Sequence, residues 1–243
     1  MTTDLQTKLN YQLMSRTASY ANGVHAFRDS YKGKEAEVPK QLLYDNNGEI
    51  IIRPLTFKEN ISARVEDFET LQNPDGTERT LDERLRLFDS WLDSCTGIAY
   101  SAEQTADFKI IPVCRELITI PSGFNKEYIG VNYNSLEGIA LKRSQAKYNQ
   151  SLTQSEVLEH HGWLAAVEED KNLLQTYNSI VFANMAQSNG TAMGFYLRTQ
   201  IQENQLRALF VYRSISISNA IGSDYLYNRA SFLRVAPPSS KIF

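Results

Sequence analysis

The chain has 243 residues, 42% of them hydrophobic and 22% charged. This composition supports a buried core and excludes a globally disordered chain. The formal net charge of −3 argues against non-specific binding to nucleic acid, which requires a basic surface. The sequence has no apolar run long enough to span a membrane, no signal peptide and no disulfide framework. We therefore expect a protein of the reducing cytoplasm, or of a particle assembled there.

Residues 1–31 are predicted to form an amphipathic helix, because apolar side chains recur along them at intervals of one or two turns. The stripe consists of Leu5, Leu9, Leu13, Tyr20, Val24 and Phe27. Since the following segment does not continue this stripe, we interpret residues 1–34 as a helical arm that packs on another subunit. Residues 35–243 then form a single α+β domain with an extended tail at 236–243, where two successive prolines disfavour regular structure.

The next patterns predict a hairpin and a pair of helices. Turn-forming residues at 45–48, in "YDNNGE", predict a β-hairpin within residues 41–57. Three T-x-x-E stretches predict helix starts, because the threonine and the glutamate can cap each other's backbone amides. These stretches begin at Thr56, Thr80 and Thr153. We expect the first two helices to form an αα-hairpin, with the second continuing through Cys95 and ending at Gly97.

The second half of the chain alternates between strand and helix patterns. Short apolar runs between Gly97 and Lys142, "ELITIP" among them, predict short strands. The stripe from Leu173 to Met185 predicts a helix, and the apolar runs after Thr191 predict further strands. The expected fold class is α+β: an N-terminal helix, an early β-hairpin, an αα-hairpin, short and mostly antiparallel strands, further helices and C-terminal antiparallel strands.

The sequence carries no strong catalytic or metal-binding motif. No phosphate-binding, dinucleotide-binding or nucleophile-elbow pattern occurs. Cys95 and Cys114 lack the spacing of zinc ligands, so we expect buried structural thiols, no metal and no cofactor. Asp89 and Asp93 share a face of the predicted helix, which suits a divalent cation, but a solvated polar face explains them better.

The stretch "TQSEVLEHHGWLAAVEED", which begins at Thr153, holds the best candidate site. Glu156 and His160 are four residues apart on one helix face, so they could form an acid–base couple if they face a cleft. We favour a structural interpretation, in which a helix begins at Thr153 and ends at Gly162. His160 and His161 would then complement the exposed carbonyls of its last turn. We assign neither catalysis nor a metal to them.

Composition and patterns together favour a non-enzymatic structural or interaction subunit of a larger assembly, such as a virion or a phage-tail-like particle. The 13 tyrosines suit interfaces, because the tyrosine side chain is amphipathic and loses little entropy on ordering. The expected partners are other protein subunits, bound through the N-terminal helix and the C-terminal tail. Neither a membrane nor nucleic acid is expected as a partner.

Two alternatives remain open. One is a hydrolase in which a histidine and Asp or Glu residues converge in space. The other is a nucleoprotein subunit that stacks bases on tyrosines and uses a local basic cluster, although a solvated strand or helix end explains that cluster equally well. The basic cluster consists of Lys142, Arg143 and Lys147, and the candidate stacking residues are Tyr128, Tyr133, Tyr212, Tyr225 and Tyr227.

Overall fold

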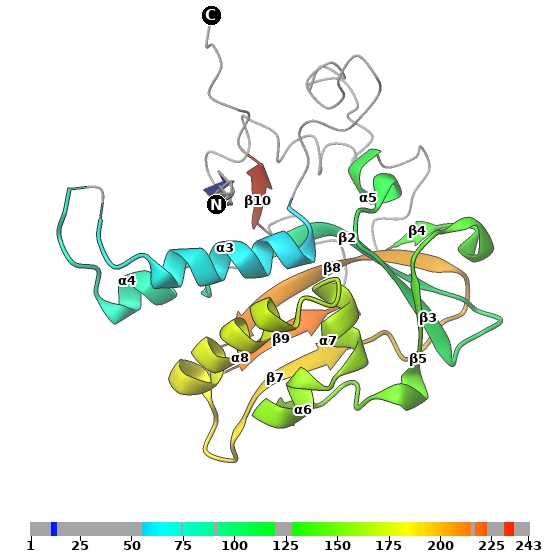
Figure 1. Ribbon diagram of the computed structural model, residues 1–243. Helices are drawn as coiled ribbons and strands as arrows, with labels where there is room; N and C mark the ends of the chain where they lie inside the picture. Colours follow the sequence, from blue (N-terminus) through cyan, green and yellow to red (C-terminus); the bar gives the residue numbers. More distant parts are fainter. Residues whose placement is uncertain are drawn as a thin grey trace, which may run out of the picture.

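The computed structural model describes residues 11–13, 55–73, 75–89, 92–119, 128–214, 217–222 and 231–235, and it shows a mixed α+β fold (Figure 1). The strands are β1 (Tyr11–Leu13), β2 (Leu92–Tyr100), β3 (Asp107–Ile111), β4 (Ile129–Gly130), β5 (Ile139–Lys142), β6 (Ser151–Thr153), β7 (Thr191–Tyr196), β8 (Gln205–Ser214), β9 (Ile217–Ile221) and β10 (Ser231–Val235). The helices are α3 (Phe57–Glu69), α4 (Leu81–Leu85), α5 (Arg115–Thr119), α6 (Gln154–Leu158), α7 (His161–Ala166) and α8 (Lys171–Met185), with the short 3-10 turns η2 (Tyr133–Ser135) and η3 (Arg143–Gln145). The hairpin turn predicted at 45–48 and the predicted tail at 236–243 lie outside the described residues.

The described strands form a curled mixed sheet that divides into two branches along β2 and β8. These two strands are antiparallel, with Leu92 opposite Val211 and Tyr100 opposite Gln205. Near Leu92 the strand order is β1-β10-β2-β8-β9-β7-β6. Near Tyr100, β3 and β5 continue the sheet beyond β2, while β4 pairs with β8. One edge of β2 and one edge of β8 are therefore each shared by two different strands.

An irregularity in β2 marks the point where the branches separate. The pairing of β2 with β8 shifts register between Asp93 and Gly97. Within this irregularity the buried hydroxyl of Thr96 donates a hydrogen bond to the carbonyl of Pro112 at 2.7 Å and accepts one from the N–H of Phe57 at 2.8 Å. The bulge thus ties the start of α3 and the end of β3 to the centre of the sheet.

Both faces of β2 and β8 are buried, which explains why neither strand alternates between apolar and polar residues. On one face, Ile98 and Leu209 belong to a large core that also contains apolar residues of α3, α7 and α8. Figure 1 shows α3 and α8 lying over this face. On the other face, Ala99 and Leu206 belong to a smaller cluster with α5 and η2. In the described part of the chain, no helix combines the length and the apolar character needed to cross a membrane.

The capping predictions are confirmed at the starts of α3 and α4. The hydroxyl of Thr56 accepts a hydrogen bond from the N–H of Glu59 at 3.1 Å, and the Glu59 carboxylate accepts one from the N–H of Thr56 at 2.7 Å. The same reciprocal pair begins α4. At α6 the Glu156 carboxylate accepts from both the N–H and the hydroxyl of Thr153, at 2.8 and 2.9 Å. These local signals therefore locate three helix starts correctly.

Three predictions of secondary structure are wrong. Tyr11–Leu13 form a strand, not part of a helix, because β10 of the same chain offers them an antiparallel edge. The helix after Thr80 ends at Leu85, and Cys95 lies in β2, where burial on both faces resembles a helical stripe. The segment "ELITIP", predicted as a strand, contains most of α5, which covers the smaller cluster through Leu117. The rest of the predicted arm at 1–34 lies outside the described residues.

We expect the substitution Gly194→Ala to destabilise the fold by about 2 kcal/mol, because the added methyl group has no room. A Cβ on Gly194 would lie 2.6 Å from Cε2 of Tyr196 and 2.7 Å from the backbone oxygen of Gln150, the residue before β6. Gly130→Ala in β4 is the matched control, since its Cβ would meet nothing within 4 Å. Urea unfolding measures both variants, and equal midpoints for the two would contradict this expectation.

Candidate binding surface

The structure divides the predicted helix at 153–162 into two. α6 ends at Leu158, and His160 serves as the N-cap of α7. The Nδ1 atom of His160 accepts hydrogen bonds from the N–H groups of Gly162 at 3.1 Å and of Trp163 at 3.3 Å. The buried imidazole supplies the acceptor that a new helix start requires. Gly162 therefore lies in the first turn of α7 and does not end a helix, which corrects the prediction.

The His160 side chain is neutral and bonded at both nitrogens. Because Nδ1 accepts from backbone N–H groups, the proton resides on Nε2, which donates to the carbonyl of Lys147 at 2.9 Å. His160 is 3% exposed, and its ring stacks on Phe195 and meets the edge of Tyr148. Burial lowers the pKa of His160 below its ordinary value. The imidazole therefore offers no free nitrogen for acid–base chemistry.

Glu156, the other candidate residue, is also held by its neighbours. Its carboxylate caps Thr153, as described above, and forms an ion pair with the ammonium group of Lys147. The hydrogen bond from Lys147, followed by those from Thr153, lowers the pKa of Glu156 to about 2. A carboxylate with this pKa stays ionised and is poorly suited to transfer a proton near neutral pH. Glu156 and His160 thus have structural roles, and each of them bonds to Lys147.

The aspartates and cysteines considered as metal ligands do not form a metal site in the described part of the chain. Asp93 lies in β2 and Asp89 in the turn after α4, so the prediction that they share a helix face is wrong. Cys95 and Cys114 are buried free thiols, and burial raises the pKa of Cys114 well above its ordinary value. Among the described residues, no three His, Cys, Asp or Glu side chains are placed to hold a metal ion.

The tyrosines considered for base stacking are covered or lie outside the described residues. Tyr133 is 4% exposed, and the ammonium group of Lys109 lies 4.5 Å from its ring centre. Tyr128 and Tyr212 are half-buried. Tyr225 and Tyr227 fall outside the described part of the chain. None of the three described candidates is therefore a fully exposed ring.

A different surface is formed by three loops at the end of the fold remote from β1 and β10. The loops are residues 101–106 between β2 and β3, 143–150 between β5 and β6, and 197–204 between β7 and β8. They emerge together because Tyr100, the last residue of β2, pairs with Gln205, the first residue of β8, and because β3 and β5 are antiparallel (Figure 1). We call these three loops the loop platform.

One arginine and one tyrosine connect the loops of the platform. The guanidinium of Arg143 donates to the carbonyl of Thr105 at 2.9 Å and to the carbonyl of Arg198 at 2.5 Å. Next to it, the hydroxyl of Tyr100 donates to the carbonyl of Gly222 at 2.9 Å and accepts from the N–H of Arg198 at 3.2 Å. Burial raises the pKa of Tyr100 to about 12, so the hydroxyl keeps its proton and remains a donor.

Two asparagines complete the fixation of the platform. The side-chain oxygen of Asn149 accepts from the N–H of Leu197 at 2.6 Å, and Asn149 itself adopts a φ of 61°, which asparagine tolerates better than most residues. The side-chain oxygen of Asn204 accepts from the N–H of Ala102 at 2.9 Å. The bonds of Arg143, Asn149 and Asn204 run from a side chain to the backbone of another loop, so they hold the loops in place independently of the outward-facing side chains.

The outward side chains of the loop platform are mostly uncharged amides and hydroxyls. Those that are exposed and make no side-chain hydrogen bond to another described residue are Gln104, Thr105, Ser144, Gln150, Thr199, Gln200 and Gln202. The exposed charges are of both signs, and they are Glu103, Lys147 and Glu203. Of the basic cluster, Lys147 pairs with Glu156 and Arg143 bonds to carbonyls, so the platform is not a cationic surface.

Comparisons with known proteins define the fold but not a family. No protein-family model matches the sequence, and the search of curated proteins gives no match. A solved structure matches with a TM-score of 0.51 and 16% sequence identity, over 74% of this chain and 86% of that chain. It is described by the words "Accommodation of massive sequence variation in Nanoarchaeota by the C-type lectin fold". The likeness shows a C-type lectin-like fold.

No sequence pattern predicted the loop platform, which draws residues from three segments of the C-type lectin-like fold. Lys142, Arg143 and Lys147 were predicted to be either a basic cluster or a solvated end of a strand or helix. The informative signal was the mostly uncharged polar character of "RSQAKYNQ" and "QENQ", which separate apolar runs. Such tracts indicate loops. Only the pairing of β2 with β8 and β3 shows that these loops meet.

Proposed function

We propose that the chain is a non-enzymatic binding module that holds a protein partner on its loop platform. The observation that carries this proposal is that one set of side chains fixes the loop backbones and a different set is exposed. Arg143, Tyr100, Asn149 and Asn204 fix the backbone, while exposed amides and hydroxyls face outward without bonds to the fold. Loops fixed before binding lose little entropy when a partner arrives, so more of the contact energy appears as affinity.

The chemistry of the platform selects a neutral, hydrogen-bonding partner surface. Amide and hydroxyl groups both donate and accept hydrogen bonds, whereas the few exposed charges carry opposite signs. Binding should therefore depend weakly on salt, because screening acts mainly on exposed charges. The likeness to a fold described as accommodating massive sequence variation supports this proposal, since side chains without bonds to the frame can be exchanged without disturbing it.

A role as one subunit of a larger assembly is part of this proposal, and it rests on the composition rather than on a described interface. The N-terminal arm and the C-terminal tail, proposed as further contacts, lie largely outside the described residues. The described part of the arm, Tyr11–Leu13, pairs with β10 of its own chain. The narrower expectation of a virion or a phage-tail particle gains no support from the fold or the comparisons.

A photo-crosslinking experiment in the source cells tests the platform. A photoreactive phenylalanine analogue at Gln200 is expected to capture a protein partner, whereas the same group at Gln175, exposed on α8, is not. With the captured partner purified, the triple change Gln104→Ala, Thr199→Ala and Gln202→Ala should weaken binding about tenfold. Gln175→Ala should leave it unchanged, and binding that the triple variant retains in full, or that disappears with added salt, would refute the proposal.

A further inference from the structure

The described residues from the end of α3 to the first residues of α4, 69–73 and 75–82, form a second outward feature, which we call the acidic arm. It extends beyond the sheet on the side away from the loop platform (Figure 1). The arm folds back on itself: the N–H of Arg79 donates to the carbonyl of Leu71 at 2.8 Å, and the N–H of Asn73 donates to the carbonyl of Thr77 at 2.8 Å. Gly76, with a φ of 87°, forms the turn at the tip.

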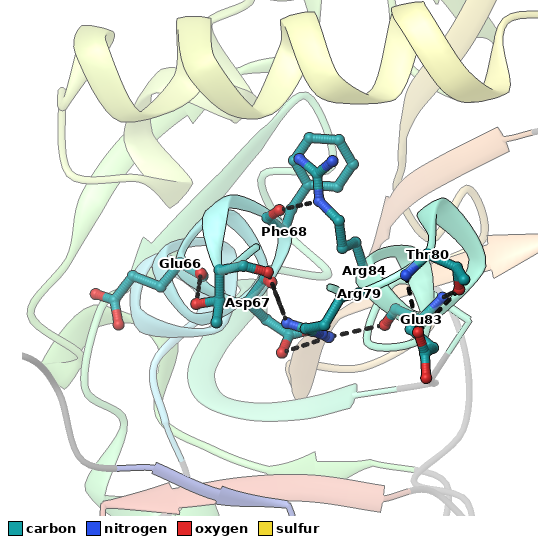
Figure 2. A network of polar contacts seen from close by, with 8 residues as sticks. Glu66, Asp67, Phe68, Arg79, Thr80, Glu83 and Arg84 are labelled. Carbon is teal, nitrogen blue, oxygen red and sulfur yellow. Dashed lines mark hydrogen bonds and ion pairs between the residues drawn. The ribbon is translucent and has the colours of Figure 1, made fainter. Parts of the chain in front are cut away.

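The base of the acidic arm is held by two arginines, which Figure 2 shows between α3 and α4. The Arg79 guanidinium donates to the carbonyl of Asp67 at 2.6 Å and to the carbonyl of Glu83 at 2.8 Å, and it pairs with the Asp67 carboxylate at 3.1 Å. The Arg84 side chain donates to the carbonyl of Phe68 at 2.6 Å and lies over the Phe68 ring at 4.2 Å. Since the last turn of α3 has no basic residue of its own, these arginines supply the positive charge that its carbonyls favour.

Two leucines remain exposed on this fixed arm. Leu71 is 59% exposed and Leu81 is 49% exposed. The two leucines lie on the outgoing and returning segments of the arm. The carbonyl of Leu71 accepts a hydrogen bond from the N–H of Arg79, which is two residues before Leu81. A rigid loop that keeps two large apolar side chains in water gains nothing from them for folding, but it presents them to a partner at a small entropic cost. Val113, between β3 and α5, is 46% exposed and lies outside the arm.

Acidic residues accompany the two leucines on the arm. Glu69, Asp75, Glu78 and Asp82 are exposed, and none of these four forms an ion pair with another described residue. Arg79, the one basic residue of the arm, is occupied by Asp67 at its base. Two hydrogen bonds from Thr77 lower the pKa of Asp75. The exposed surface of the arm is therefore apolar at the leucines and anionic around them.

We propose that the acidic arm is a docking element for another protein, one whose surface has an apolar pocket rimmed by lysine and arginine side chains. The leucines fill the pocket and supply most of the affinity, because buried apolar anchors dominate interface energetics. The four carboxylates steer the approach and fix the orientation. This contact is independent of the loop platform, which lies at a different end of the fold and whose outward side chains are mostly uncharged.

Selection from a phage-displayed library of random peptides against the full chain tests the partner's chemistry. The selected peptides are synthesised, and their affinities are measured by fluorescence anisotropy at low and high salt. We expect a group of peptides that combine apolar with basic residues and bind more weakly as salt rises. Leu71→Ser with Leu81→Ser should weaken this group about tenfold or more. Val113→Ser, a change of similar exposure elsewhere, should have no effect.

Two further measurements make the outcome decisive. The change Glu69→Gln with Glu78→Gln neutralises two of the four carboxylates, so it should remove about half of the salt dependence and retain the apolar contact. The platform variant Gln104→Ala, Thr199→Ala, Gln202→Ala should bind these peptides normally, which separates this proposal from the proposed function. Peptides that bind the Leu71/Leu81 variant at full strength would overturn the proposal. So would self-association in sedimentation velocity that the same variant abolishes, because the occupant would then be a second copy of this chain.

Discussion

Replacing Trp163 by alanine is expected to destabilise the fold by about 4 kcal/mol, the largest effect of any change considered in the described residues. Trp163 is fully buried in α7, and its ring lies 5.6 Å from Phe57, 6.4 Å from Tyr177 and 6.0 Å from Phe195 between ring centres. These residues come from α3, α8 and β7, so truncation leaves a cavity where three elements meet. Urea unfolding followed by circular dichroism gives the free energy of unfolding of each variant.

Trp163→Phe is the informative companion of the alanine variant. The indole Nε1 of Trp163 is buried and has no hydrogen-bond partner among the described residues. A phenyl ring keeps most of the apolar contact and removes this unsatisfied donor, so we expect a loss of only about 1 to 2 kcal/mol. If alanine and phenylalanine cost the same, the ring contacts with Phe57, Tyr177 and Phe195 do not stabilise the fold as we describe.

The parts of the fold that the sequence predicted are those set by neighbours in the chain. The threonine–glutamate caps at Thr56 and Thr80 involve residues three apart, so their geometry follows from local spacing. The helix from Lys171 to Met185 has one buried face and a cap at Asp170, whose carboxylate accepts from the N–H of Leu173 at 3.0 Å. The mixed α+β class follows from the same signals.

The errors arose where contacts distant in sequence overrule local pattern. β2 is buried on both faces, so its apolar residues continued the stripe of the preceding helix and Cys95 was assigned to it. His160 looked like the last turn of a helix, because sequence spacing does not show that its ring lies under Phe195 and caps α7. Tyr11–Leu13 became a strand because β10, more than 200 residues later in the chain, supplies its edge.

The candidate site was the least predictable part, for the same physical reason. The loop platform combines residues 101–106, 143–150 and 197–204, and none of these tracts carries a chemical motif alone. Arg143 acts by donating to carbonyls of the two other loops, a role that its charge does not reveal. A binding surface that depends on loop conformation and neutral side chains has no characteristic sequence motif, whereas catalytic and metal sites require particular residue types.

His160→Ala is expected to destabilise the fold by about 3 kcal/mol, because it removes a helix cap and a buried ring and leaves the Lys147 carbonyl without its donor. The neighbouring His161 is exposed, so His161→Ala is a matched control with an expected change below about 0.5 kcal/mol. Thermal and urea unfolding at pH 8 measure both. A similar loss for the two variants would contradict the capping role of His160.

The stability of the unchanged chain should also fall on acidification through His160. Burial lowers the pKa of His160 in the folded state, whereas the unfolded chain keeps the ordinary value of about 6.5. The unfolded state therefore binds the proton more readily, so this contribution to stability is fully present above about pH 6.5 and is lost as the pH falls through that value toward the folded-state pKa.

His160→Asn supplies a neutral cap without a titrating ring. Urea midpoints measured from pH 8 to pH 5 should decline less steeply for His160→Asn than for the unchanged chain, while His161→Ala should follow the unchanged chain. Parallel pH profiles for the unchanged chain and His160→Asn would show that His160 is not the group responsible.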